Sequence, residues 1–238
     1  MICEICVDSI AGVRAAKQAG ARRVELCADL LEGGITPSLG VIRQARKVSG
    51  IDLNVMIRPR GGDFLFNEDE FATMRADIET AKAEGANGVV IGLLTAAGEV
   101  DIARTRELAA LARPLSVTFH RAFDVAAEPF RALETLIELG VDRVLTSGQE
   151  PTAYEGAERI AELIKASVDR VIVMPGAASA HAMSPASLQS PAQARSTSPR
   201  ACRRRAPCAT AAPTCIWAAS SARPNTTASI PPPPPSPP

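Results

Sequence analysis

Two cysteines near the start of the chain have a spacing that suits a soft metal ion. Cys6 and Cys27 fall on the same face of two predicted strands, residues 2–7 and 23–27, and both lie near the ends of these strands. Neighbouring strands lie about 4.8 Å apart, so the two side chains can converge. Thiolates favour Cu(I), and two of them suffice for a linear site. A structural role for Cys6 and Cys27 stays open, because buried cysteine is a common apolar filler. Cys3 lies an odd number of residues before Cys6, so its side chain is expected to face outward.

A second group of side chains is suited to binding an anion. Arg58 and Arg60 follow the third predicted strand, next to two glycines, in a turn whose two cations suit an anionic group of a substrate. Thr146 and Ser147 follow the sixth predicted strand and could add hydroxyl and amide donors. These four residues are the expected anion contacts.

An enzyme would need acid–base groups, and the same strand ends offer two of them. His120 ends the fifth predicted strand, with Arg121 and Asp124 close by, and Glu25 could act as a carboxylate base. The candidate catalytic residues are therefore Glu25, Arg58 and His120. A histidine near two charges is more often a satisfied structural residue. Because the sequence contains no Walker motif, H-E-x-x-H or G-x-S-x-G pattern, no named reaction follows.

These residues must be positioned by a repeated alternation of strands and helices. Seven β-rich runs occur, and stretches of helical periodicity separate them. The predicted strands are residues 2–7, 23–27, 52–58, 88–92, 115–120, 143–146 and 170–174, and the predicted helices are residues 9–19, 38–48, 68–84, 101–111, 128–139 and 152–166. Such βα units require a parallel sheet, either open and doubly wound or closed as an eight-stranded barrel. The barrel is favoured because no G-x-G-x-x-G pattern follows the first strand.

The strand faces indicate a polar barrel interior. Alternation places Glu25 opposite Val24 and Leu26, and the apolar face suits the outer layer of helices. Barrel interiors are normally filled by branched apolar residues, so inward charges would be costly unless they pair or bind a ligand. We favour a polar ligand site over a purely structural charge network. By the same parity, Arg58 is expected within reach of Glu4 or Glu25.

Composition divides the chain of 238 residues after residue 176. The 26 basic residues balance the 26 acidic ones, but all acidic residues precede residue 177, which leaves residues 1–176 with a net charge of −6. That charge argues against nucleic acid as a partner. No apolar run approaches the roughly 20 residues of a membrane span, so a cytoplasmic location is expected. Three cysteines in a domain of this size do not indicate a disulfide framework.

Six motifs follow one another along the first three quarters of the chain. They are EICVDS at residues 4–9, VELC at 24–27, EGGITPS at 32–38, MIRPRGGDF at 56–64, FHRAFD at 119–124 and LTSGQ at 145–149. Together they resemble the copper homeostasis protein CutC family. The resemblance implies a TIM-barrel fold, a cytoplasmic protein and a role in handling or binding copper. It also implies Cys6 and Cys27 as copper ligands, since both fall in the family's N-terminal cysteine motifs.

The segment from residue 177 to residue 238 does not continue this pattern. It carries six Arg and no acidic residue, together with 13 of the 19 prolines. A barrel still needs a seventh helix, an eighth strand and an eighth helix, and this Ala/Pro/Ser-rich tail offers none of them. Its composition permits a disordered extension. Back-translation at one constant offset yields a helix, a strand and family-like motifs in order, which favours a frameshifted translation.

The expected fold is an α/β TIM-type (β/α)8 barrel, complete through its seventh strand over residues 1–176, with a low-complexity, disordered tail over residues 177–238. The expected function is that of a cytoplasmic copper homeostasis protein that binds Cu(I) through Cys6 and Cys27. The alternatives are a barrel enzyme acting on a small anionic metabolite and a non-functional frameshifted product. The expected partners are a copper ion or a small anionic ligand, without nucleic acid or membrane, and a homo-oligomer stays open.

Overall fold

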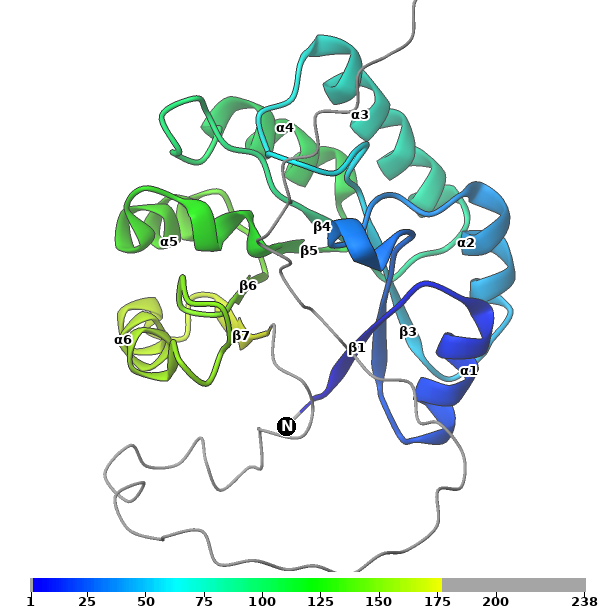
Figure 1. Cartoon of the computed structure of the whole chain (residues 1–238). Helices are drawn as coiled ribbons and strands as arrows, with labels where there is room; N and C mark the ends of the chain where they lie inside the picture. Colours follow the sequence, from blue (N-terminus) through cyan, green and yellow to red (C-terminus); the bar gives the residue numbers. More distant parts are fainter. Residues whose placement is uncertain (1, 177–238) are drawn as a thin grey trace, which may run out of the picture.

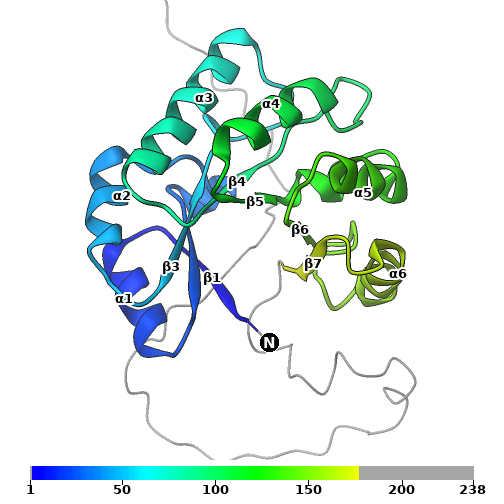
Figure 2. The same cartoon turned by 180° about the vertical axis from the view of Figure 1, so that it is seen from behind.

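The structure, a computed structural model, describes residues 2–176 of the chain. Seven parallel strands form one curled sheet in the order β1-β2-β3-β4-β5-β6-β7, with helices on its outer side (Figures 1 and 2). The predicted barrel architecture is confirmed for its first seven strands. The predictions of a disordered and frameshifted tail concern residues 177–238, which lie outside the described residues.

Strands and helices alternate along the chain as predicted. The strands are β1 (Glu4–Val7), β2 (Arg23–Leu26), β3 (Asp52–Met56), β4 (Gly88–Ile91), β5 (Ser116–Phe119), β6 (Arg143–Thr146) and β7 (Ile172–Pro175). The α-helices are α1 (Ile10–Gln18), α2 (Leu39–Arg46), α3 (Glu68–Ala83), α4 (Ile102–Ala112), α5 (Pro129–Glu138) and α6 (Ala157–Ser167). Two short 3-10 helices, η1 (Leu30–Glu32) and η2 (Arg121–Val125), lie in the loops after β2 and β5.

Side-chain caps determine where several of the helices begin. Ser9 and Ser38 precede α1 and α2, and each hydroxyl accepts a backbone N–H from three residues further along. Asn67 and Glu70 form a capping box at the start of α3, in which each side chain accepts the backbone N–H of the other residue at 2.8–2.9 Å. The caps therefore fix the length of the loops that follow the strands.

Two elements differ from the prediction at the carboxyl ends of the strands. β3 ends at Met56 rather than at residue 58. The backbone N–H of Arg58 donates to the side-chain Oγ1 of Thr36 at 2.9 Å and not to a neighbouring strand. The helix predicted from residue 152 begins at Ala157. The residues before it form a turn in which Glu155 donates its backbone N–H to Thr152 Oγ1 at 3.2 Å.

An apolar layer between the sheet and the helices fixes which strand faces point inward. Val24, Leu26 and Val55 are fully buried in this layer together with residues of the helices. The alternate side chains must then face the interior, where Glu25 and Asn54 are buried. The predicted polar interior is therefore correct.

Part of this interior is a structural network at the amino ends of the strands. Glu4 forms an ion pair with Arg23, and Asn54 Nδ2 donates to Glu4 Oε2 at 3.0 Å. Arg143 Nε donates to Thr118 Oγ1 at 3.1 Å. The charged groups of this network are paired, and the pocket that could hold a ligand lies at the carboxyl ends of the strands.

β1 and β7 are the two outer strands of the described sheet. Among residues 2–176 they do not pair with each other. Arg23 Nη2 lies 4.0 Å from Met174 Sδ, so side chains from β2 and β7 meet across the interior. No helix in the described part of the chain is long and apolar enough to cross a membrane.

Candidate functional site

Cys6, Glu25 and Cys27 come together at the carboxyl ends of β1 and β2. The strand register places Cys6 beside Glu25, and the backbone N–H of Cys27 donates to the carbonyl of Val7 at 3.0 Å. The Sγ atoms of Cys6 and Cys27 are 2.9 Å apart. One ligand atom from each of the three residues lies within 4.8 Å of the other two. The structure thus brings together the two cysteines that the sequence singles out and adds Glu25 to them.

Glycine at position 34 makes room for this group. Its φ of +90° lies in the left-handed region, which favours glycine. A Cβ atom at Gly34 would lie 3.2 Å from the Cys27 sulfur. Ala28 and Ile35 form an isolated antiparallel bridge around this turn, which holds the loop against Cys27. The glycine is therefore required by both the turn and the close approach of the sulfur.

The surroundings of Cys6 and Glu25 favour the protonated forms of these two groups. The hydrogen bond with Cys27, followed by burial and the charge of Glu25, raises the pKa of the Cys6 thiol well above its usual value. Burial, followed by the charge of Glu4, raises the pKa of Glu25 to about 8. The Oε2 atom of Glu25 is buried and has no hydrogen-bond partner among the described residues. Binding of a cation would release the thiol proton.

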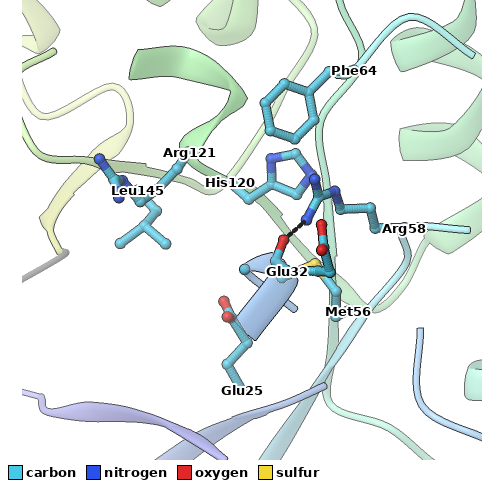
Figure 3. A pocket seen from close by; sticks show the side chains of 9 residues that line it. Glu25, Glu32, Met56, Arg58, Phe64, His120, Arg121 and Leu145 are labelled. Atoms are coloured by element: carbon cyan, nitrogen blue, oxygen red, sulfur yellow. Dashed lines mark hydrogen bonds between the residues drawn. The ribbon is translucent and has the colours of Figure 1, made fainter. Parts of the chain in front are cut away.

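A pocket opens above this group at the carboxyl ends of the strands. Its empty volume is about 380 Å³. Figure 3 shows Arg58 and His120 next to each other near Phe64, with the Glu25 carboxylate pointing toward the same space from below. The lining residues are Glu25, Glu32, Gly33, Met56, Arg58, Phe64, His120, Arg121 and Leu145. The three candidate catalytic residues therefore share one pocket, whereas sequence reasoning missed Glu32, Phe64 and Leu145 as parts of it.

Arg58 is held by backbone carbonyl groups. Its Nη1 donates to the carbonyls of Glu32 at 2.7 Å and Gly34 at 3.0 Å, and its Nη2 donates to the carbonyl of Gly62 at 2.8 Å. The guanidinium also lies over the Phe64 ring, 5.0 Å from its centroid. Burial lowers the pKa of Arg58.

The expected pairing of Arg58 with Glu4 or Glu25 is wrong. Arg58 does face the interior, as its parity predicts, but its guanidinium donates to the carbonyls of the loops instead of to a carboxylate. Glu4 is bound instead to Arg23 and Asn54. Arg58 is consequently fixed at the edge of the pocket by the loops that follow β2 and β3.

His120 is buried next to Arg58. Its Nδ1 accepts the backbone N–H of Ala122 at 3.1 Å, while its Nε2 is buried without a hydrogen-bond partner among the described residues. Burial and the charge of Arg58 lower the pKa of His120 to about 3. A neutral imidazole whose Nδ1 accepts a hydrogen bond carries its proton on Nε2. His120 is therefore an N–H donor at neutral pH.

The other expected anion contacts have partners within the protein. Arg60 Nε donates to Glu70 Oε1 at 2.6 Å, and Arg60 Nη2 donates to Asp63 Oδ1 at 2.9 Å. Its guanidinium lies 5.1 Å from the centroid of the Phe66 ring. Arg60 is not among the residues that line the pocket, and its contacts fasten the loop after β3 to the first turn of α3.

Thr146 and Ser147 surround the carboxylate of Asp124. Thr146 Oγ1 donates to Asp124 Oδ1 at 2.5 Å, and the backbone N–H of Ser147 donates to the same carboxylate at 3.0 Å. Arg121 Nε donates to Asp124 Oδ2 at 2.7 Å. Neither Thr146 nor Ser147 lines the pocket. The donors that the sequence assigns to a ligand are thus used to join the loops after β5 and β6.

Relatives of the chain share its sequence and its fold. It is 54% identical over 176 residues to a family protein CutC of Chromobacterium violaceum, covering 74% of this chain and 71% of that one. It is 50% identical over 173 residues to the copper homeostasis protein cutC homolog of Homo sapiens, covering 73% of this chain and 63% of that one.

Solved structures lead to the same group of proteins. A CutC structure from Streptococcus agalactiae superposes with a TM-score of 0.69 at 33% identity, covering 73% of this chain and 86% of that one. A solved aldolase has a TM-score of 0.53 at 14% identity, covering 73% and 77%, and supports the barrel fold alone. The sequence model of the CutC family matches residues 1–188. The chain therefore belongs to the CutC family.

Proposed function

We propose that this protein is a cytoplasmic copper homeostasis protein that binds Cu(I) as its cargo through Cys6 and Cys27. The observation that carries this proposal is the 2.9 Å contact between the two sulfur atoms, with the Glu25 carboxyl beside them. The human and mouse relatives are both named copper homeostasis protein cutC homologs, which supports the choice of metal. A reducing compartment suits this role because the two thiols must stay reduced.

The donor atoms fit a soft monovalent ion. Two thiolates form a donor set that selects Cu(I), whereas carboxylate oxygen suits harder cations. We therefore assign metal binding to Cys6 and Cys27. Glu25 is assigned to the surroundings of the ion, where its carboxyl group lies beside the Cys6 sulfur.

Burial limits the net charge that the site can carry. Cys27 and Glu25 are buried, so any net charge left at the site is costly. Two thiolates and one Cu(I) ion leave a single negative charge. A Glu25 that keeps its proton adds no further charge, and burial of this carboxyl favours that form. A protonated Glu25 therefore keeps the copper-loaded site at a single negative charge, while the choice of Cu(I) over harder ions rests on the two sulfur donors.

A Cu(I) competition titration against a chelator such as bicinchoninate tests this proposal. The chain contains six cysteines, and Cys202, Cys208 and Cys215 lie outside the described residues, so all three are replaced by serine in the starting protein. We expect one Cu(I) per chain in this protein, and loss of that ion when Cys6→Ser and Cys27→Ser are combined.

Cys3 provides the matched control, because it is exposed and directly precedes β1, the strand that carries Cys6. The Cys3→Ser variant should bind Cu(I) with unchanged affinity and stoichiometry. The proposal fails if the double variant at Cys6 and Cys27 binds copper as tightly as the starting protein does.

A further inference from the structure

Three polar side chains in the pocket have buried atoms without partners among the described residues. These atoms are Glu25 Oε2, Arg58 Nε and His120 Nε2. The residues themselves are exposed by only 2%, 5% and 4%. Buried polar groups are nearly always hydrogen-bonded, and each exception needs an explanation. Three such exceptions on one cavity indicate that their partner is a molecule bound in it.

We propose that this pocket binds a small organic acid, whose carboxylate accepts hydrogen bonds from Arg58 Nε and His120 Nε2. This site is additional to the Cu(I) site formed by the two cysteines. It uses donors from the loop after β3 and from the end of β5, whereas the sulfur atoms come from β1 and β2. The empty space of the pocket, about 380 Å³ including its open mouth, restricts the ligand to a small molecule.

Arg58 is prepared to bind an oxyanion before any ligand arrives. A guanidinium has five N–H groups, and three of them are used by the carbonyls of Glu32, Gly34 and Gly62. These bonds fix the plane of the group and leave two N–H groups, of which the Nε–H is on a buried atom without a partner among the described residues. A donor that is already oriented loses little conformational freedom on binding, which favours affinity.

His120 supplies the second donor in a fixed orientation. The backbone N–H of Ala122 occupies Nδ1, so the proton of the neutral ring must be on Nε2. Phe64 contacts both donors: its ring centroid is 5.0 Å from that of His120 and 5.0 Å from the Arg58 guanidinium carbon. One aromatic ring thus holds the two donors side by side, as Figure 3 shows.

The remaining walls define the class of ligand. Met56, Phe64 and Leu145 provide apolar surface for a short carbon chain. Glu25 Oε2 faces the same space and suits a hydroxyl group on that chain. The Glu32 carboxylate lies on the wall close to Arg58 and partly offsets its charge, which favours a monoanionic carboxylate over a dianionic phosphate.

Glycolate, which combines one carboxylate with one hydroxyl, is the probe for a direct test. The chain contains two histidines, His120 and His181, so ¹⁵N spectra of the imidazole nitrogens can be assigned with one variant. We expect glycolate to shift the Nε2 resonance of His120 saturably in the full chain. If glycolate and acetate leave this resonance unchanged, or if inorganic phosphate alone binds, the proposal is overturned.

Two substitutions of His120 distinguish the loss of its hydrogen-bond donor in the pocket from a general disturbance of the structure. His120→Asn can keep an acceptor for Ala122 and loses the donor in the pocket, while His120→Gln can retain a donor near the position of Nε2. We expect the affinity for glycolate, measured by calorimetry, to fall about tenfold or more in the first variant and much less in the second. Equal losses in both variants would overturn the assignment of His120.

Two further proteins serve as controls for this measurement. Arg131→Gln removes a cation from α5 that is 73% exposed, pairs with Glu99 and does not line the pocket, and this change should leave glycolate binding unchanged. The variant with Cys6→Ser and Cys27→Ser should lose copper and keep glycolate. Failure of glycolate binding therefore leaves the Cu(I) proposal intact, and failure of copper binding leaves this one intact.

Discussion

The sulfur atoms of Cys6 and Cys27 lie 2.9 Å apart, on adjacent strands of the sheet. The contact follows from the register, in which Cys6 is level with Glu25 and Cys27 is two residues further along β2. The hydrogen bond from the backbone N–H of Cys27 to the carbonyl of Val7 continues the pairing past the end of β2. Two thiols that are 21 residues apart in the sequence are thus held in contact by backbone geometry.

Alkylation should distinguish Cys6 from its neighbour Cys3. The thiolate is the reactive form, and the raised pKa of Cys6, caused first by its hydrogen bond with Cys27 and then by burial, keeps this thiol protonated. We expect iodoacetamide at neutral pH to label the exposed Cys3 well before Cys6, as measured by peptide mass spectrometry. In urea the two rates should become similar. Faster labelling of Cys6 in the folded protein would contradict the structure.

His120 should make the protein less stable in mild acid. Its pKa falls from an ordinary value of 6.5 to about 3 on folding, so the unfolded chain binds more protons between these values. The contribution to the free energy of unfolding is therefore fully present above pH 6.5. It is lost at about 1.4 kcal/mol for each pH unit below that value, down to about pH 3.

The His120→Asn variant isolates this contribution from that of the carboxylates. Urea denaturation of both proteins at several pH values between 4 and 7 should give a steeper loss of stability for the wild-type chain. The charge of Arg58 acts on the ring in the same direction as burial, because it disfavours a second positive charge. Parallel stability curves for the two proteins would mean that His120 is not buried as a neutral ring.

Sequence parity succeeded where the residues lie inside strands. Cys6 and Glu25 are strand residues, and Cys27 directly follows β2, so their inward direction and their proximity could be inferred from alternation alone. The same rule gave the inward direction of Arg58 but not its partners, which are the carbonyls of Glu32, Gly34 and Gly62. Parity predicts the face on which a side chain lies, whereas its partners depend on the loops around it.

Loop contacts account for what the sequence did not reveal about the site. The motif at residues 119–124 marked His120 and Asp124 as chemically interesting, but it gave no information on their partners. The structure shows that the Asp124 carboxylate accepts hydrogen bonds from Thr146 and Ser147, at the end of β6 and in the loop after it. His120 Nδ1 accepts the backbone N–H of Ala122, two residues further along the chain. Such pairings depend on the conformations of two loops at once, which no local pattern encodes.

Gly92 should be required for the position of His120. A Cβ atom at Gly92 would overlap the imidazole ring and would also lie 2.9 Å from the Cβ atom of Ala122. We expect Gly92→Ala to lower the free energy of unfolding by about 1–3 kcal/mol, the usual cost of overpacking. Gly40→Ala is the matched control: this site on α2 has open space, with the nearest atom, Ser38 Oγ, at 3.9 Å. There alanine should stabilise the helix by up to about 1 kcal/mol. Urea denaturation measures both changes, and equal effects would contradict the packing around His120.

The Asp124 carboxylate should be the most costly acidic group to neutralise in the loops around the pocket. It is 6% exposed and accepts hydrogen bonds from Thr146, Ser147 and Arg121. Asp124→Asn removes the charge that these donors surround and should cost about 3–5 kcal/mol, the usual loss when one partner leaves a buried ion pair. Glu134→Gln, at a 50% exposed ion pair with Arg170, should cost about 1 kcal/mol or less. Denaturant unfolding measures the free energy of unfolding of both variants. If Asp124→Asn lowers it no more than Glu134→Gln does, the Asp124 carboxylate does not hold the loops after β5 and β6 together.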